Sequence, residues 1–306
     1  MISIYHKTIK DRGLNQIKEP KAGSWVYVEN PSEKELEYLS GSLNLELDLL
    51  KDSVDPLEVP RLEIEDGKTY IFTRVPHKEG LIISTVPLLV IIGSDFITTI
   101  SQKPIPSLNK FMEGKISFNT TQKTKLFLQI FSEINSAYEI FMTNINRQVR
   151  ATRVHVQKIS NREIAKFVTF EDSLNDFLSS LVPTNGILSR LLSGRVLELY
   201  EEDRDLVEDL LLGNNQLIEL ARSNLKSIVN VRGAYSTIMS NNLNRVVKFL
   251  TALTVVLNVP VIVSSLYGMN VNLPLADSPL AFWFIMGITL PISLVLFWIF
   301  VKKDWL

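Results

Sequence analysis

Polar side chains recur at a regular interval along an apolar run near the C-terminal end of the chain. Residues 249–266 hold no charged side chain, and 18 uncharged residues are enough for a helix to cross the hydrocarbon core of a bilayer. Counted in heptads from Asn244, one stripe of this helix contains every polar residue of the run except Ser264. The stripe consists of Asn244, Val247, Thr251, Thr254, Asn258, Val261, Ser265 and Gly268.

The amides and hydroxyls of the stripe limit what the helix can face. Lipid offers no hydrogen bonds, so a row of polar groups must lie against protein or water. Two interpretations remain: the polar residues join two helices, or several copies of the helix surround an aqueous pore. A contact with one partner helix needs one or two polar residues, whereas this stripe runs through the full depth of the membrane. The pattern therefore favours the pore.

A second uncharged run, residues 280–301, follows the first after a short loop. Trp283 and Trp298 lie near its ends, as expected for aromatic side chains at the two membrane interfaces. Basic residues flank the pair of spans, but none lies in the loop between them; the flanking residues are Arg245, Lys248, Lys302 and Lys303. The positive-inside rule predicts a multi-pass protein of the cell membrane with both termini in the cytoplasm and only the loop outside.

The chain before the first span predicts a long helix that projects from the membrane. Between residues 202 and 266 proline occurs only at position 260, so one helix of about 65 residues would be roughly 100 Å long, far more than a bilayer. Continued backwards, the stripe stays polar almost throughout, which suits a wide water-filled funnel better than a dimeric coiled coil. The apolar residues that can pack against the soluble body are Leu206, Leu210, Leu217, Leu220, Leu225 and Ile228.

The first 100 residues predict an α/β domain with about six strands. The strand-like runs are residues 1–5, 24–29, 62–64, 69–75, 81–85, 86–92 and 96–101. Pro87 is expected to separate two of them, and Asp66-Gly67 to form a hairpin turn. Ser32 with Glu35 is a capping box that should begin a short helix.

From residue 121 onward the pattern becomes helical. Helices are expected at 124–160, at 164–181 and, beyond Pro183, at 187–192. The predicted fold is an α+β membrane protein. Its parts are a cytosolic α/β and helical domain (1–200), a stalk helix (201–248), a pore-lining span (249–267), an external loop (268–279), a second span (280–301) and a cytosolic basic tail (302–306).

Composition argues against several other classes of protein. No cysteine is present and the three histidines are far apart, so disulfides, thiolate sites and a histidine-rich transition-metal site are not expected. The net charge of −1 gives no sign of nucleic-acid binding, and the N-terminus lacks the apolar run of a secretory signal. P-loop, Gly-x-Ser-x-Gly and zincin motifs are absent, so a membrane-anchored enzyme or sensor is the weakest alternative.

Tyr267-Gly268-Met269-Asn270, at the end of the first of two C-terminal spans, resembles the signature of the CorA-type divalent-cation channels. Its place after a polar-striped helix and before a short loop makes the resemblance specific. Further similar positions are Asn244, Lys248, Leu250, Thr251, residues 25–31 and residues 55–63, so the resemblance covers the whole chain. It implies a funnel-shaped homopentamer in which the first span of each subunit lines one pore for hydrated Mg²⁺.

The resemblance also implies roles within that pore. Gly268, Met269 and Asn270 correspond to a selectivity filter, where a ring of Asn270 oxygens binds the water shell of the ion. Mg²⁺ sheds water reluctantly, so neutral amides and hydroxyls suit a hydrated ion. Val247 and Leu250 are candidates for a hydrophobic constriction that closes by dewetting. The other pore-lining candidates are Asn244, Thr251, Thr254, Asn258, Val261 and Ser265.

Family members sense cytosolic Mg²⁺ with carboxylates between neighbouring soluble domains, and the bound ion holds the closed state. Counted without gaps from Asn244, the stalk carboxylate of that site falls on Asp209, with Asp205 and Glu202 beside it. Asp95, at a strand–turn edge, is a candidate partner. Clustered acids repel when the cation leaves, so the subunits loosen and the pore can open. Mg²⁺ is then both the transported and the regulatory ion, and no catalytic cofactor is expected.

One departure from the family leaves the identity of the ion open. Family loops often carry an acidic residue just after the Gly-Met-Asn segment, whereas the only acid of this loop is Asp277. That arrangement weakens the electrostatic concentration of cations at the mouth of the pore. A transporter of zinc, cobalt or nickel with the same fold is therefore the alternative to a magnesium channel.

Overall fold

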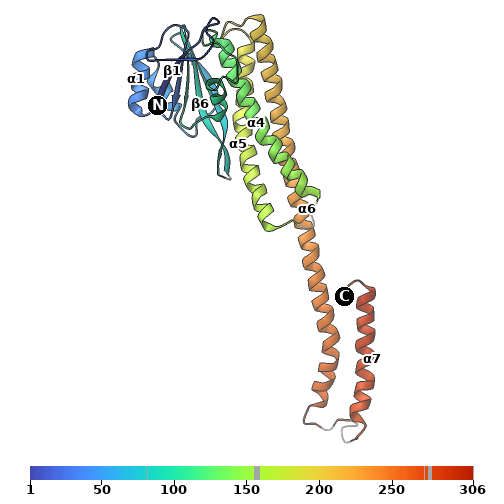
Figure 1. Cartoon of the computed structure of the whole chain (residues 1–306). Helices are drawn as coiled ribbons and strands as arrows, with labels where there is room; N and C mark the ends of the chain where they lie inside the picture. The colour runs from blue at the N-terminus through green and yellow to red at the C-terminus, as the bar shows by residue number, and fades with distance from the viewer. Residues whose placement is uncertain (81, 155–158, 272, 275–277, 306) are drawn as a thin grey trace. The chain divides into compact units, whose positions relative to one another are not determined.

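The computed structural model describes residues 1–80, 82–154, 159–271, 273–274 and 278–305. The chain forms two compact units, Met1–Val231 and Arg232–Leu306 (Figure 1). The first unit is an α/β body, and the second is built from helical segments. The helix α6 (Glu201–Tyr267) begins in the first unit and continues into the second, as the predicted long helix requires.

A seven-stranded sheet with the order β2-β1-β3-β7-β6-β5-β4 forms the centre of the first unit. β3 and β7 are parallel, and the other neighbouring pairs are antiparallel. The strands are β1 (Ile2–His6), β2 (Asn15–Ile17), β3 (Ser24–Glu29), β4 (Arg61–Glu65), β5 (Lys68–Glu79), β6 (Ile82–Ile92) and β7 (Phe96–Ser101). The sequence did not predict β2, because this short edge strand buries none of its residues fully.

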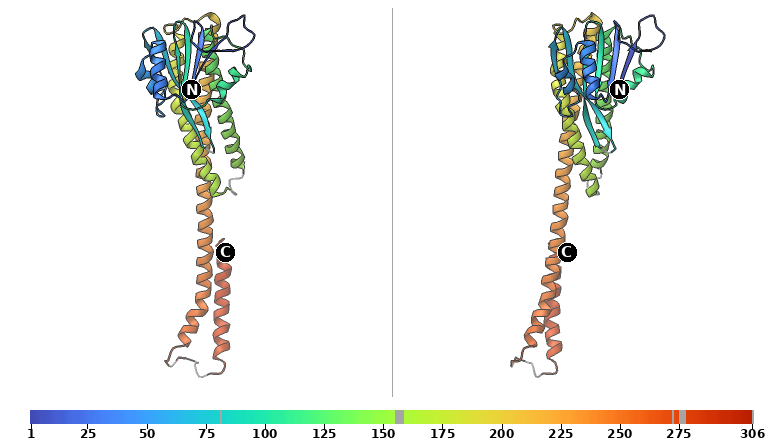
Figure 2. Two further views of the ribbon diagram at one scale, coloured as in Figure 1. Left: turned by 60° about the vertical axis from the view of Figure 1, so that its left-hand side comes forward. Right: turned by 90° about the vertical axis from the view of Figure 1, so that its left-hand side faces the viewer.

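Two layers of helices cover the two faces of the sheet. On one face α1 (Glu33–Leu43) and α2 (Leu47–Asp52) pack on an apolar cluster that includes Val26 and Val28 of β3. Trp25, which alternates with them, packs edge-on against Phe111 of α3 (Pro106–Met112). Figures 1 and 2 show α4 (Lys123–Val154) and α5 (Asn161–Leu192) on the side of the sheet opposite α1.

Local turn and cap chemistry confirms two predictions. Ser32 accepts from the main chain of Glu35, whose carboxylate accepts from Ser32 in return, so the capping box begins α1. Asp66 and Gly67 have φ angles of 50° and 71°, the positive values that a tight hairpin turn between β4 and β5 requires.

The predicted break at Pro87 was wrong, because β6 is one strand from Ile82 to Ile92. β7 pairs with β6 only from Leu88 to Ile92, so Pro87 lies where that edge of β6 is free. Proline has no N–H to donate, and it is tolerated at a free edge because no ladder bond is lost there.

The predicted pair of helices around Pro183 was also wrong, because α5 (Asn161–Leu192) is continuous. Leu181, Thr184 and Ile187 are buried on both sides of the proline, so tertiary packing offsets the missing main-chain bond. The side chain of Asn214 in α6 adds a hydrogen bond of 2.9 Å to the Leu181 carbonyl.

The predicted helix at 124–160 corresponds to α4 (Lys123–Val154), and residues 155–158 lie outside the described residues. Within the first unit α6 packs as predicted: Leu210, Leu217 and Ile228 are buried, and Leu206, Leu220 and Leu225 are half-buried.

The second unit contains the C-terminal part of α6 and the helix α7 (Ala281–Lys302). Within the described chain these two helices are long and apolar enough to cross a membrane. Pro260 lies inside α6 and Pro291 inside α7. Few of their residues are buried, and these are small: Ala252 on α6, with Thr289 and Ser293 on α7.

Candidate ion pathway

The predicted pore-lining residues lie together on one exposed stripe of α6. Each of them is exposed in the single chain, with Val247 51% and Val261 60% accessible. The full set on the helix is Asn244, Val247, Leu250, Thr251, Thr254, Asn258, Val261 and Ser265. A row of amides and hydroxyls exposed along an apolar helix is a surface that needs a polar partner.

The least exposed residues of α6 in the second unit lie on a different face of the helix. The residues of α6 that are buried or half-buried in this unit are Ala252, Val256, Val259, Pro260 and Val263. This face is lined by small and β-branched side chains. The sequence did not reveal it, because small apolar residues are common throughout the span. The polar stripe is not part of this face and remains exposed.

The polar groups of the stripe fall into two kinds. The hydroxyls of Thr251 and Thr254 donate to the carbonyls of Val247 and Leu250, each at 2.8 Å, so their bonds remain within α6. The amides of Asn244 and Asn258 have no hydrogen-bond partner in the part of the chain that the structure describes. Such amides can donate to and accept from water, which is the contact that a hydrated cation offers.

The predicted filter follows directly on the last turn of α6. Gly268 N–H donates to the Ser264 carbonyl at 3.0 Å, and Met269 N–H to that of Leu266 at 3.3 Å. A Cβ on Gly268 would lie 3.3 Å from the Ser264 oxygen, which is tight and accounts for glycine at this position. Asn270 follows in an exposed bend. The predicted loop acid Asp277 lies outside the described residues.

A tryptophan lies near each end of the second span, and lysines lie at its C-terminal end. Trp283 and Trp298 are exposed, and Lys302 Nζ lies 5.1 Å from the ring centre of Trp298. An exposed tryptophan with an adjacent lysine is the composition of a membrane–water boundary.

The four predicted regulatory acids do not form a metal site within one chain. Among the described residues, no three or more histidine, aspartate or glutamate side chains are placed to hold a metal ion. Glu202 accepts from Lys125 Nζ at 3.2 Å, and Asp205 is exposed. Asp95 accepts from the Ser94 hydroxyl at 3.2 Å. Burial lowers the pKa of the neighbouring Lys123, and the charge of Asp95 partly offsets this lowering.

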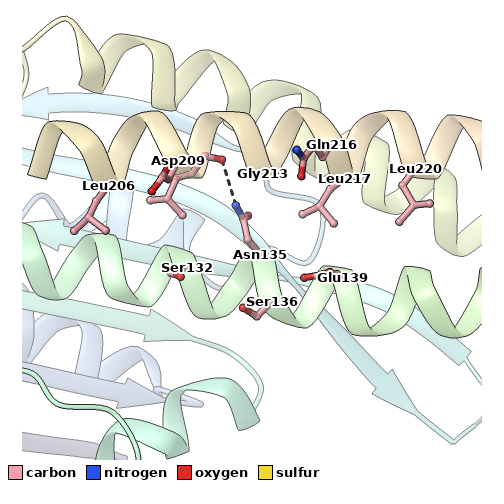
Figure 3. Close-up of a pocket in the computed structure, with 11 residues that line it drawn as sticks. Ser132, Asn135, Ser136, Glu139, Leu206, Asp209, Gly213, Gln216, Leu217 and Leu220 are labelled. Carbon is pink, nitrogen blue, oxygen red and sulfur yellow. Dashed lines mark hydrogen bonds between the residues drawn. The ribbon is translucent and has the colours of Figure 1, made fainter.

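Asp209 lines a groove of about 360 Å³ between α4 and α6, shown in Figure 3. Glu139, Ser136 and Gln216 line the same groove, and Asn135 donates to the Leu210 carbonyl across it at 3.4 Å. The groove contributes oxygen atoms of the kind that Mg²⁺ binds. Glu139 was not among the predicted residues, because its position on the exposed side of a long helix gives no signal in the sequence.

These features define a class of protein: a membrane protein with an N-terminal soluble α/β body, one long helix and two C-terminal spans. A family model described as "CorA-like Mg2+ transporter protein" matches residues 20–303. The chain belongs to this family.

One relative is similar in sequence, and two solved structures share the fold. The cobalt/magnesium transport protein CorA of Methanocaldococcus jannaschii is 26% identical over 289 residues, which cover 92% of this chain and 91% of that protein. The complete structure of the CorA magnesium transporter from M. jannaschii superimposes with a TM-score of 0.88 at 23% identity, covering 100% and 99% of the two chains. The ZntB cytoplasmic domain from Vibrio parahaemolyticus shares the fold of 78% of this chain, with a TM-score of 0.64 at 10% identity and 99% of that domain covered.

Proposed function

We propose that this protein is a magnesium transporter that takes up hydrated Mg²⁺ passively through a pore formed by several copies of α6. The observation that carries the proposal is the polar stripe, which remains exposed and which ends at Gly268-Met269-Asn270. Family membership supports the same ion class, as does the magnesium and cobalt transport for which the relatives are named. Relatives of this kind are transporters, and no enzymatic activity is proposed.

In the proposed pore, rings of side chains hold the water shell of the ion. Asn270, with Gly268 and Met269, forms the filter at the outer mouth, and Asn258, Thr254, Thr251 and Asn244 repeat amide and hydroxyl contacts inward. Neutral groups suit Mg²⁺ because they bind its water without stripping it. Val247 and Leu250 form the constriction, because a narrow apolar ring excludes water when it closes. Val261 and Ser265 complete the lining.

The proposed assembly is a homopentamer in the cell membrane, with both termini in the cytoplasm. The subunit number comes from the resemblance to the CorA-type channels, and the orientation from the basic residues that flank the spans. The proposed segments are the soluble domain (1–200), stalk (201–248), first span (249–267), external loop (268–279), second span (280–301) and basic tail (302–306).

Regulation is proposed to depend on cytosolic Mg²⁺ held between subunits by Asp209, with Asp205, Glu202 and Asp95 as further candidates. No complete cluster of ligands was found among the described residues of one chain, so a second subunit would have to supply the remaining oxygens. Loss of the ion leaves like charges facing each other, which favours separation of the subunits and opening.

Ion uptake into proteoliposomes tests the function directly. A Mg²⁺-sensitive dye trapped inside liposomes with the full-length protein should report entry of Mg²⁺ from outside, and protein-free liposomes should not. Uptake is also measured with Zn²⁺, Co²⁺ or Ni²⁺ to test the alternative. The proposal expects Mg²⁺ to enter when none of these other ions is present. Uptake of Zn²⁺ without uptake of Mg²⁺ would make the protein a zinc transporter of the same fold.

A further inference from the structure

The end of the α4–α5 hairpin carries an excess of positive charge that the proposed pathway does not use. Residues 143–166 contain six lysines and arginines against one glutamate. We call the five described basic residues of this segment, all of them exposed, the basic tip. They are Arg147, Arg150, Arg153, Arg162 and Lys166.

No carboxylate among the described residues forms an ion pair with the basic tip, although Lys166 acts electrostatically on Glu163 and its Nζ lies 5.6 Å from the ring centre of Phe170. The ion pairs found among the described residues all lie elsewhere. Glu163, the one acid of the segment, accepts instead from the main-chain N–H and hydroxyl of Ser160 at 2.8 and 2.9 Å, in the capping box that begins α5. The positive charges are therefore available to a partner outside the chain.

Helix dipoles account for only one of these residues. Cations are stabilised in the last turn of a helix, which suits Arg153 at the end of α4. Arg147 and Arg150 lie before that turn, where the effect has fallen off. Arg162 lies in the first turn of α5, where the dipole disfavours a cation. The fold itself gives no reason for most of the charge.

The basic tip lies at the end of the first unit from which α6 continues (Figure 1). α4 and α6 run in the same direction within this unit, since Asn135 of α4 bonds to Leu210 at 3.4 Å and further along Asn224 of α6 bonds to the Met142 carbonyl at 3.5 Å. Only residues 232–248 separate this unit's last residue from the uncharged run of the first span. As part of the helix α6 these residues are roughly 25 Å long, which limits how far the first unit can lie from the bilayer that the first span enters.

We propose that the basic tip binds anionic phospholipid headgroups of the membrane that the spans enter. Guanidinium groups bind phosphate oxygens through paired hydrogen bonds, so arginine-rich surfaces suit this partner. Each basic side chain close to an anionic leaflet strengthens binding about fivefold. The proposal rests on the membrane assignment under the proposed function and not on which ion is carried.

Energy transfer from the tip to the lipid surface tests this proposal. The chain has no cysteine, so a single Ala151→Cys change at an exposed position gives one site for a fluorescent donor. The full-length protein is placed in nanodiscs with acceptor-labelled headgroups, in phosphatidylcholine alone or mixed with phosphatidylglycerol. Transfer should increase severalfold in the anionic discs and fall back at high salt, because salt screens the surface charge.

A matched pair of triple variants identifies the responsible residues. Arg147→Glu, Arg150→Glu, Arg153→Glu should abolish the response to phosphatidylglycerol. Lys10→Glu, Arg12→Glu, Lys18→Glu changes the charge equally at exposed residues near the N-terminus and should keep it. Equal transfer in both lipids, or equal loss in both variants, would overturn the proposal.

Two further measurements distinguish the lipid contact from a contact between subunits and from the transport function. If the tip variant dissociates into smaller assemblies by native mass measurement while the lipid has no effect on the parent protein, the tip joins subunits and the proposal is wrong. Mg²⁺ uptake by liposomes made from the same preparation is measured in parallel. If the protein responds to the lipid but does not transport Mg²⁺, the lipid contact is upheld and only the proposed transport function is refuted.

Discussion

The asparagines of α6 differ sharply between the two units through which the helix passes. In the first unit Asn214 and Asn224 are buried, and they donate to main-chain carbonyls of α5 and α4. In the second unit Asn244 and Asn258 are exposed and have no hydrogen-bond partner among the described residues. The NH₂ groups of the two buried asparagines donate within the chain, although Asn214 Oδ1 accepts no hydrogen bond, whereas the amides of Asn244 and Asn258 do neither among the described residues.

The apolar residues of α6 show the same division. Leu210, Leu217 and Ile228 are buried in the first unit, whereas only 6% of the most apolar window of the helix is buried. Lipid can cover exposed leucines and valines, but it cannot satisfy exposed amides. The difference distinguishes residues that hold the fold from the exposed residues to which the proposed function assigns a shared pathway.

Among substitutions that test this difference between the two units, the largest expected effect is a loss of stability in the first unit. Ile228→Ala removes a fully buried side chain and should lower the free energy of unfolding by about 2–5 kcal/mol. Leu212→Ala, on an exposed part of the same helix, should change it by less than about 0.5 kcal/mol. Urea unfolding of the detergent-solubilised protein measures both, and similar midpoints for the two variants would contradict the assigned burial.

Loss of flux is the next largest expected effect, at the predicted filter. Asn270→Ala should lower Mg²⁺ uptake at least about tenfold, because one hydrogen bond of about 1 kcal/mol is removed from each subunit around the ion. The control is Val271→Ala, one residue further along the same exposed segment, which should retain uptake. Liposome flux measures both; normal uptake by Asn270→Ala would argue strongly against the pore.

The same substitution at two asparagines of α6, one in each unit, tests directly whether the two parts of the helix have different roles. Asn258→Leu should reduce flux several-fold and leave the unfolding midpoint nearly unchanged, because its amide has no described partner in the chain. Asn224→Leu should do the reverse, lowering stability by about 1 kcal/mol through loss of its bond to Met142. If both variants changed the same property, the division of α6 into structural and pathway parts would be wrong.

The smallest expected effect concerns regulation. Asp209→Asn should raise the cytosolic Mg²⁺ concentration needed for half-inhibition by about twofold to threefold, as expected for removal of one partly exposed carboxylate from a group. Asp48→Asn, on the exposed surface of α2, is the charge-matched control. Inhibition curves from liposomes preloaded with different Mg²⁺ concentrations measure the shift, and identical curves would remove Asp209 from the sensing site without affecting the pore.

The sequence predicted those features that depend on local chemistry. The capping box of Ser32, the turn at Asp66-Gly67 and the continuous α6 are confirmed, because each depends on neighbouring residues and on helix periodicity. Pro87 and Pro183 misled the prediction, since proline's local preference to end an element was outweighed by a free strand edge in one case and by tertiary packing in the other.

Features that depend on contacts between residues distant in the sequence were harder to predict from the sequence. The exposure of the polar stripe followed from its spacing, but the burial of Ala252, Thr289 and Ser293 in the second unit did not, because no motif marks these residues. The groove that joins Asp209 and Glu139 arises only when α4 and α6 lie together. Residues that meet through tertiary packing leave no regular spacing in the sequence.

Pro260 has a mechanical consequence for the end of α6. A proline cannot donate to the carbonyl four residues before it, so the helix loses one bond at Val256 and bends more easily there than in its regular turns. Tilting or twisting of the residues before this point is therefore transmitted only in part to Gly268, Met269 and Asn270. The stiffness of α6 is uneven along its length, and the most compliant turn lies about two turns before the predicted filter.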